Sequence, residues 1–162
     1  MERREEYCYR DVKRLTEHLR PRREEGDRLV LANGCFDLLH VGHIRYLEGA
    51  ASHGEILVVA LNDDESARAL KGKGRPLFPE MERAEMLLAL RPVDFVLIFS
   101  GGTVDGVIRE LRPDIHAKGT DYGVESVPEV ETARSVGCRT VIVGDPKDHS
   151  SSDIIARIET ES

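Results

Sequence analysis

Two histidines, His40 and His43, stand three residues apart, directly after a short apolar run and a loop that contains Gly34. The apolar run, residues 29–32, is typical of a buried strand, and a helical spacing of apolar residues begins at Val41. Residues i and i+3 share a face of a helix, so both imidazoles are expected to point the same way. The first backbone N–H groups of a helix attract anions. The segment therefore predicts a place where a phosphate is held and its charge neutralised.

Further polar residues in the chain suit the same task. Lys71 and Lys73 alternate with glycine in a basic loop at residues 71–75, and a run of serines precedes the expected last helix. Asp37 and Asp121 fall at expected strand-to-helix turns. Cationic donors, hydroxyl groups at a helix start and loop carboxylates together suit a nucleoside triphosphate bound with Mg²⁺. The patterns G-x-x-x-x-G-K-[ST] and G-x-G-x-x-G are absent, which argues against a P-loop kinase and a common NAD-dependent dehydrogenase.

Several of these residues also have simpler interpretations. The histidine pair could be metal ligands, but no third Cys, His, Asp or Glu stands at the usual helical spacing, so no protein-bound metal is expected. Cys35 is expected to be a small packing residue, because no base is evident beside it. Asp37 could bond loop amides and fix the turn instead of contacting substrate. The serine run could serve as a helix cap, and the two lysines of the basic loop could be only solvated.

The composition describes an ordinary globular protein. The chain has 162 residues, of which 40% are hydrophobic and 33% charged, and its formal net charge is −7. No nucleic-acid or membrane partner is expected, because such surfaces are usually basic and no stretch approaches the ~20 apolar residues that span a bilayer. Cys8, Cys35 and Cys138 are far apart and odd in number, which argues against a disulfide framework. These features predict a reducing, cytoplasmic setting.

Short apolar runs alternate with helical patterns along the chain. Strands are expected at residues 28–32, 55–61, 95–99, 115–118 and 139–143, and helices at 41–52, 80–90, 103–111, 128–136 and 152–159. Thr103 is expected to cap the helix at 103–111. The alternation predicts an α/β, Rossmann-like three-layer sandwich with a five-stranded parallel sheet. Ligands are then expected at the carboxyl ends of the strands, near the topological switch point.

The first 27 residues are expected to lie outside this alternation. Residues 7–20 form an extra N-terminal helix in this interpretation, with Val12, Leu15 and Leu19 on one face, and residues 21–27 form a polar link. The chain is thus divided into residues 1–27, the helix and link, and residues 28–162, the nucleotide-handling part. One domain overall is expected.

Five motifs occur in an order that resembles the HxGH nucleotidyltransferase superfamily. Residues 40–43 match its HxGH signature, and residues 33–40 resemble the heptose 1-phosphate adenylyltransferase branch in particular. The basic loop resembles a KGxxRP loop, residues 82–85 an arginine-bearing helix, and residues 118–122 a KGxDY turn. Residues 150–155 resemble a terminal S-T-[ST]-x-x-I pattern. The similarity extends from about residue 28 to residue 159.

The resemblance implies that ATP and a sugar 1-phosphate give an ADP-sugar and pyrophosphate, with a heptose 1-phosphate as the expected sugar substrate. It also implies that the reaction uses Mg²⁺ with ATP and that the protein is a homodimer, as members of this family commonly are. An acceptor phosphate is already an anion, so the reaction needs positioning and charge neutralisation rather than a general base. The implied catalytic residues are His40, His43 and Lys71. The implied nucleotide-binding residues are Asn33, Gly34, Cys35, Phe36, Asp37, Arg83, Lys118, Gly119, Asp121, Ser150, Ser151 and Ser152.

Two departures from the family pattern concern the acceptor more than the reaction. Residues 123–129 lack the expected Thr-Pro and later glycine, and residues 100–102 replace a typically acidic stretch. The alternatives are a cytidylyltransferase acting on glycerol 3-phosphate or a similar acceptor, and an FAD synthetase. An alternative of another class is a catalytically silent nucleotide-binding module.

Overall fold

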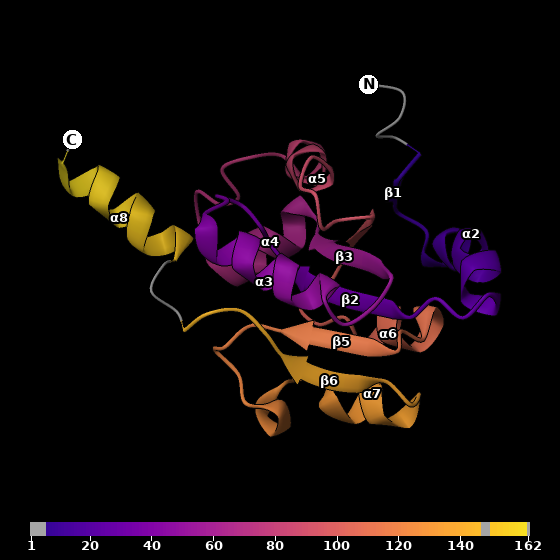
Figure 1. Cartoon of the computed structure of the whole chain (residues 1–162). Helices are drawn as coiled ribbons and strands as arrows, with labels where there is room; N and C mark the ends of the chain where they lie inside the picture. Colours follow the sequence, from indigo (N-terminus) through magenta and orange to yellow (C-terminus); the bar gives the residue numbers. More distant parts are fainter. Residues whose placement is uncertain (1–5, 147–149, 162) are drawn as a thin grey trace.

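The strand that leads into the histidine pair lies inside a parallel sheet. The computed structural model describes residues 6–146 and 150–161, and these residues form one sheet with the strand order β1-β4-β3-β2-β5-β6 (Figure 1). Every neighbouring pair of strands is parallel. The strands are β1 Cys8–Tyr9, β2 Leu29–Gly34, β3 Ile56–Asn62, β4 Phe95–Phe99, β5 Ile115–Lys118 and β6 Arg139–Ile142.

The prediction of five strands was wrong by one, because it placed residues 8 and 9 in a helix. These residues form β1, in which Cys8 pairs with Val96 and Tyr9 with Leu97 of β4. The backbone N–H of Val96 also donates to the Tyr7 carbonyl oxygen at 3.0 Å. A strand of two residues has no periodicity of its own, so this strand exists because the edge of β4 offers it hydrogen-bond partners.

The N-terminal helix forms, but with other bounds than predicted. Helix α2 is Val12–Glu24; Asp11 caps it, accepting the Lys13 N–H at 2.9 Å. It continues through Pro21, where the sequence predicts a polar link. Its last turn is anchored by side chains: Arg22 donates to Asp27 at 2.7 Å, and Arg23 to the Arg112 carbonyl oxygen at 3.1 Å. These bonds offset the backbone hydrogen bond that proline cannot make.

Helices cover both faces of the sheet (Figure 1). α3 (Val41–Ala51) and α5 (Glu80–Leu88) pack on one face, where Leu47 and Leu87 are fully buried. α2 and α6 (Asp105–Leu111) pack on the other, where Leu15 and Ile108 are fully buried. α7 (Val130–Ser135) lies beside α6 and β6, and α8 (Ser151–Glu161) projects away from the sheet. Among the described helices, none is both long and apolar enough to cross a membrane.

Two local predictions need correction. Lys71 was expected in a loop but is the last residue of α4 (Asp64–Lys71), a helix that the sequence did not reveal because few of its residues are apolar. Thr103 does not cap α6. Its hydroxyl donates to the Asp105 carboxylate at 2.6 Å, and Val104 occupies the cap position without a side-chain hydrogen bond.

The strand order places the switch point between β2 and β5. The chain winds from β2 through β3 to β4 on one side and then crosses to β5 and β6 on the other. In open parallel sheets, ligands bind outside the carboxyl ends of the strands at such a point. The segments that follow β2 and β5 begin at Cys35 and Gly119, so they carry the histidine pair and the predicted KGxDY turn.

Candidate active site

The histidine pair forms the N-terminal cap of α3. His40 is the cap residue, and its Nδ1 accepts the Gly42 backbone N–H at 3.1 Å. The backbone N–H of His40 in turn donates to Nδ1 of His43 at 3.3 Å. The two side chains thereby satisfy backbone donors that a helix start leaves without partners.

These two bonds fix which nitrogen of each ring carries a proton. A nitrogen that accepts a hydrogen bond bears none, so in each neutral imidazole the proton is on Nε2. Burial, followed by the charges of His40 and Lys71, lowers the pKa of His43 to about 4, so His43 is neutral near pH 7. The ring centres are 4.0 Å apart. The motif therefore presents two neighbouring Nε2–H groups as donors.

Gly42, between the histidines, is required by the His40 ring. A Cβ at this position would lie 2.9 Å from Cε1 and 3.0 Å from Nδ1 of His40. No other residue type leaves room for the ring in its capping position. The glycine of the HxGH signature thus has a steric explanation here.

The loop before the histidines is a packed support. The Phe36 ring is buried, with its centre 5.3 Å from that of His43, and it stacks on Tyr46 at 6.3 Å. Phe36 has a φ of 46°, in the left-handed region that few side chains occupy. A Cβ on Gly34 would meet the Phe36 ring at 3.0 Å, so Gly34 makes room for this ring. The Cys35 thiol is buried, which raises its pKa, as expected of a packing residue.

Asp37 lies beneath the loop at residues 75–78. Its buried carboxylate accepts from Arg75 Nε at 2.5 Å and from the backbone N–H groups of Leu77 at 2.7 Å and Phe78 at 3.1 Å. These bonds match the simpler of the two interpretations, in which Asp37 bonds loop amides. Contact of Asp37 with a nucleotide stays a prediction.

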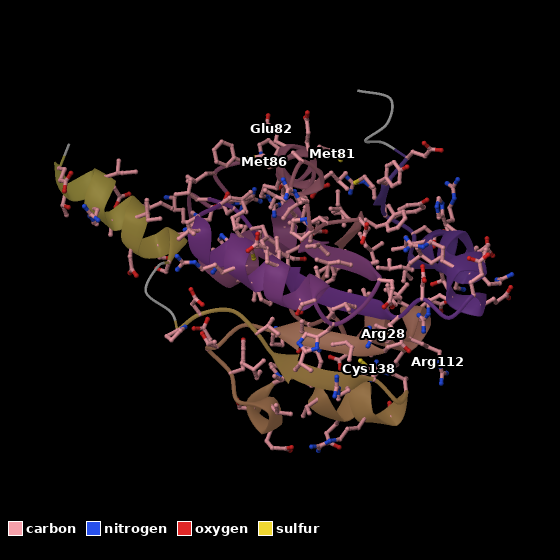
Figure 2. The ribbon with its side chains drawn as sticks, in the orientation of Figure 1. Arg28, Met81, Glu82, Met86, Arg112 and Cys138 are labelled. Atoms are coloured by element: carbon pink, nitrogen blue, oxygen red, sulfur yellow. The ribbon has the colours of Figure 1, made fainter. Side chains whose placement is uncertain are left out.

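Arg83 also faces the interior. Met81 and Glu82, its exposed neighbours, lie on the outer side of α5 (Figure 2), whereas Arg83 has no exposed surface. Its guanidinium donates to the carbonyl oxygens of Phe78, Cys35 and Asn62 at 2.9, 2.6 and 2.9 Å and to Asp64 at 2.8 Å. It therefore joins the loops after β2 and β3. Contact of Arg83 with a nucleotide stays a prediction.

Lys71, in contrast, is exposed at the end of α4. Its positive charge lowers the pKa of both His43 and Cys35, which places it on the same side of the molecule as the histidine loop. Of the two lysines in the basic segment, Lys71 is the one that acts on His43 in this way. The helix ends at Lys71 and is followed by Gly72, whose φ of 97° suits glycine.

The segment after β5 contributes a second set of charges. Lys118 is nearly buried, with Nζ 4.0 Å from Glu129 Oε2 and 4.8 Å from the centre of the Tyr122 ring. Burial lowers the pKa of Lys118, and the charges of Glu129 and Asp121 oppose that shift. Asp121 is exposed beyond Gly119. Sequence reasoning missed Glu129, because a single acidic residue near a helix start has no distinguishing pattern.

The serine run reaches the histidine loop. The Ser150 hydroxyl accepts the Asp153 N–H at 3.0 Å and so caps α8, while the Ser151 hydroxyl donates to the Leu38 carbonyl oxygen at 2.7 Å. Ser152 is exposed. Leu38 stands two residues before His40, so the start of α8 and the start of α3 are joined.

The structure brings together the histidine pair, Lys71, the start of α8 and the carboxyl ends of β2 and β5. It places Asp37 and Arg83 beneath them as supports. Sequence reasoning also missed Tyr46, whose hydroxyl donates to the Ala117 carbonyl oxygen at 2.7 Å and accepts the Asn33 N–H at 3.3 Å. Its position three residues after His43, on the buried side of α3, was the available signal. Tyr46 connects β2 and β5 at the switch point.

A cavity of about 500 Å³ lies elsewhere, between β4 and α6. It is lined by Arg10, Asp63, Ser100, Thr103 and Glu110, among others, and by none of the predicted site residues. Its Ser100 belongs to the stretch that departs from the family pattern. We place the candidate active site at the histidine pair, because the directed donors and charges are there.

Comparisons with known proteins agree with the motifs. The model of the cytidylyltransferase-like family matches residues 31–157. The bifunctional protein HldE of Desulfatibacillum aliphaticivorans is 44% identical over 148 residues, which cover 91% of this chain and 30% of that protein. HldE of Geotalea uraniireducens (strain Rf4) is 49% identical over 137 residues, covering 85% of this chain and 28% of that protein. The chain thus spans less than a third of the length of the curated relatives it matches.

A solved structure gives the same result. The crystal structure of the lipopolysaccharide core biosynthesis protein from Thermoplasma volcanium GSS1 superposes with a TM-score of 0.63 at 30% sequence identity. The match covers 75% of this chain and all of that one. With the family match over most of its length, the chain belongs to the cytidylyltransferase-like family of nucleotidyltransferases.

Proposed function

We propose that this chain transfers AMP from ATP to a sugar 1-phosphate with release of pyrophosphate, and that the sugar 1-phosphate is a heptose 1-phosphate. The motif order supports the reaction class, and residues 33–40 and 118–122 support the heptose 1-phosphate adenylyltransferase branch. The similar protein from Thermoplasma volcanium is a lipopolysaccharide core biosynthesis protein, which agrees with a sugar as acceptor.

One observation carries the proposal more than any other. Both rings of the histidine pair use Nδ1 to accept backbone N–H groups, at 3.1 and 3.3 Å, and so carry their protons on Nε2 as donors. The helix start holds these donors in place before substrate arrives, so little reorganisation is needed when charge develops. A pair of fixed donors at a helix N-terminus suits a triphosphate.

The reaction follows from charge. An oxygen of the acceptor phosphate forms a bond to the α-phosphorus of ATP while the bond from that phosphorus to the bridging oxygen of the β-phosphate breaks in line. The acceptor oxygen carries no proton to be removed, so no general base is required. Negative charge grows on the leaving pyrophosphate, where His40 and His43 donate hydrogen bonds and Lys71 supplies a positive charge.

The other predicted residues surround the same edge of the sheet. Ser150 and Ser151 at the start of α8 would bind a phosphate, since helix N-termini attract anions. Asp121 is proposed to contact the ribose or base from the end of β5. Arg83 and Asp37 act, in this proposal, by holding the loops that carry the donors.

Mg²⁺ is proposed to enter as part of the MgATP substrate. Mg²⁺ prefers oxygen ligands and commonly takes substrate phosphates with few protein groups. Among the described residues, no group of three or more His, Cys, Asp or Glu could hold a metal ion. We assign the ion to the triphosphate oxygens of this substrate.

A homodimer and a cytoplasmic setting accompany the proposal as predictions from the sequence. Sedimentation velocity of the purified chain, with and without ATP, tests the first. A mass of one chain at every concentration would contradict it.

The proposed reaction is tested by a pyrophosphate-release screen. ATP, CTP, GTP and UTP are each paired with both anomers of heptose 1-phosphate, with glycerol 3-phosphate and with FMN. ATP with one heptose 1-phosphate is expected to give pyrophosphate and ADP-heptose in equal amounts. The His40→Asn variant, purified in the same way, is the control for contaminating enzymes.

The other results of this screen are equally informative. Release with CTP and glycerol 3-phosphate would identify a cytidylyltransferase, and release with ATP and FMN an FAD synthetase. Release with no pairing, together with binding of a nucleotide, would identify a catalytically silent module.

A further inference from the structure

A set of polar side chains lies buried at β5, on the face of the sheet that α6 covers, and the proposed reaction does not use all of them. His116 is fully buried, Glu129 is 2% exposed and Lys118 is 8% exposed. His116 pairs in register with Leu31 of β2 on one side and Thr140 of β6 on the other. Buried polar atoms are nearly always hydrogen-bonded. Yet among the described residues Nδ1 of His116, Oγ1 of Thr140 and Oε2 of Glu129 have no such partner.

The hydrogen bond of the His116 side chain leads to the predicted site. Its Nε2 lies 2.9 Å from Oδ1 of Asn33. Asn33 is the last residue but one of β2 and is partly exposed. Because His116 pairs with Leu31, two residues earlier in β2, the ring lies behind the Asn33 side chain as seen from the carboxyl end of the sheet.

This contact determines the state of the imidazole. An amide oxygen only accepts hydrogen bonds, so Nε2 of His116 carries the proton. Burial and the charge of Lys118 lower the pKa of His116 to about 3, with Asp105 opposing the shift. The ring is therefore neutral with a single N–H, which is a fixed donor to Asn33.

The same contact orients the Asn33 amide. With its oxygen held by His116, the NH2 group is directed away from the ring. Among the described residues, no acceptor receives a hydrogen bond from this NH2 group. The Asn33 backbone is held as well, because its N–H donates to the Tyr46 hydroxyl at 3.3 Å. The Asn33 NH2 group is thus held beside the switch point through the side-chain oxygen and the backbone N–H of the same residue. Because no described residue accepts from it, this group is suited to donate to a ligand.

We propose that His116 is a positioning residue: its Nε2–H holds the Asn33 amide so that the Asn33 NH2 group donates to a substrate oxygen at the carboxyl ends of β2 and β5. The inference rests on the proposed function, which places the substrates at this edge. The acceptor atom is a phosphate or hydroxyl oxygen, and it belongs to the nucleotide or to the sugar phosphate. An increase in KM for only one of the two substrates identifies which.

Four variants separate positioning from simple packing. His116→Gln keeps an N–H near the position of Nε2, whereas His116→Leu fills the space without a donor. Asn33→Ala removes the amide. The fourth variant is the double substitution of His116→Leu with Asn33→Ala. His116→Leu is expected to raise KM for one substrate about tenfold with kcat nearly unchanged, as for the loss of one binding hydrogen bond. His116→Gln should restore KM. The double variant should be no worse than Asn33→Ala, because His116 acts through Asn33.

Two results would overturn the inference. The first is unchanged KM values for both substrates in His116→Leu. The second is a double variant in which the increases in KM caused by His116→Leu and by Asn33→Ala multiply. If the wild-type chain releases no pyrophosphate, the proposed function fails by itself. Dissociation constants for ATP and for heptose 1-phosphate, measured by calorimetry, then replace KM with the same expected pattern, and binding of neither ligand overturns the inference too.

A measurement without substrate completes the test. Long-range ¹H–¹⁵N NMR correlation spectra of the imidazoles, assigned with His116→Gln, should show His116 neutral with its proton on Nε2 near pH 7. A ring protonated on Nδ1, or a charged ring, would contradict the inference whatever the activity.

Discussion

The guanidinium of Arg83, which has no exposed surface, donates a 2.6 Å hydrogen bond to the backbone carbonyl oxygen of Cys35. It also bonds the carbonyl oxygens of Asn62 and Phe78. One side chain thus ties the loop before the histidine pair to the end of β3 and to the segment before α5. The site is supported from inside the core, and its stability and activity should respond together to a change at Arg83.

Replacing Arg83 by Met should therefore destabilise the protein. Three carbonyl oxygens would lose their donor in the interior, so the free energy of unfolding should fall by about 3 kcal/mol or more. Urea unfolding followed by circular dichroism measures this. Glu82→Gln, at the exposed neighbouring position, should change it by less than about 0.5 kcal/mol. An Arg83→Met variant as stable as the wild type but inactive would instead indicate that Arg83 binds nucleotide directly.

The two functions of His40 can be separated by substitution. His40→Asn keeps a side-chain acceptor at the cap and should retain the stability of α3, whereas His40→Ala should lose about 1 kcal/mol. Both remove the Nε2–H donor and should lower kcat by about 10²–10³. Urea unfolding and pyrophosphate release measure the two effects. Wild-type turnover by His40→Asn would remove the histidine from the proposed mechanism.

Gly42→Ala should damage activity more than stability. The added Cβ would lie 2.9 Å from the His40 ring, so the ring must leave its capping position, and kcat should fall about tenfold or more. The matched control is Gly106→Ala in α6, where a Cβ meets nothing within 4 Å. That change should raise the free energy of unfolding by about 0.5–1 kcal/mol and leave kcat unaltered. Equal kcat values for the two variants would contradict the steric explanation of Gly42.

The charge of Lys71 should matter more than that of Lys73. The charge of Lys71 is one of the causes that lower the pKa of His43, and the charge of Lys73 is not among them. This effect indicates that the Lys71 charge lies near the histidine pair. Lys71→Met should lower kcat/KM about 10²-fold while the free energy of unfolding is unchanged, because the side chain is exposed. Lys73→Met should stay near the wild type. Steady-state kinetics of the two variants decides between them, and the reverse order would assign the role to Lys73.

Stability should decrease on mild acidification. The pKa is about 4 for folded His43 and about 3 for folded His116, against 6.5 for an ordinary histidine. Below about pH 6.5 the unfolded chain therefore binds more protons than the folded one, and the free energy of unfolding falls. Each histidine contributes up to about 1.4 kcal/mol per pH unit. Urea unfolding down to about pH 5 should show this slope, and His116→Gln should roughly halve it. A flat profile would contradict the burial of both rings as neutral groups.

The sequence predicted the elements that have their own periodicity and missed those that depend on distant partners. The long buried strands and α3 appear where the apolar patterns place them, with α3 beginning at Val41 as expected. β1 could not be predicted, because two residues become a strand only when the edge of β4 is present. α4 was missed because only three of its eight residues are apolar and its start depends on Asp63, whose side chain caps the helix by accepting the Ser66 N–H.

The site shows the same division. Residue types and spacing indicated the histidine pair, the basic segment and the serine run. They did not show that two of the predicted nucleotide-binding residues, Arg83 and Asp37, are buried and bond the backbone of neighbouring loops. Contact of either residue with a nucleotide stays a prediction. The direction of a side chain depends on what surrounds it. The Arg83 guanidinium points inward because it meets three carbonyl oxygens from three separate segments of the chain. His116 received no predicted role, because its importance lies in a contact with Asn33 across 83 residues of chain.

The strand order also bears on how the chain folds as it is synthesised. β1 pairs with β4, and α2 packs against α6, so residues 8–24 make their main contacts with segments made much later. Contacts between distant residues form slowly. Leu15 and Leu19 are buried in the finished protein but stay uncovered while the ribosome is still adding α6. The residues that emerge early therefore keep an apolar side exposed until their late partners have been made, and transiently exposed apolar surface favours aggregation.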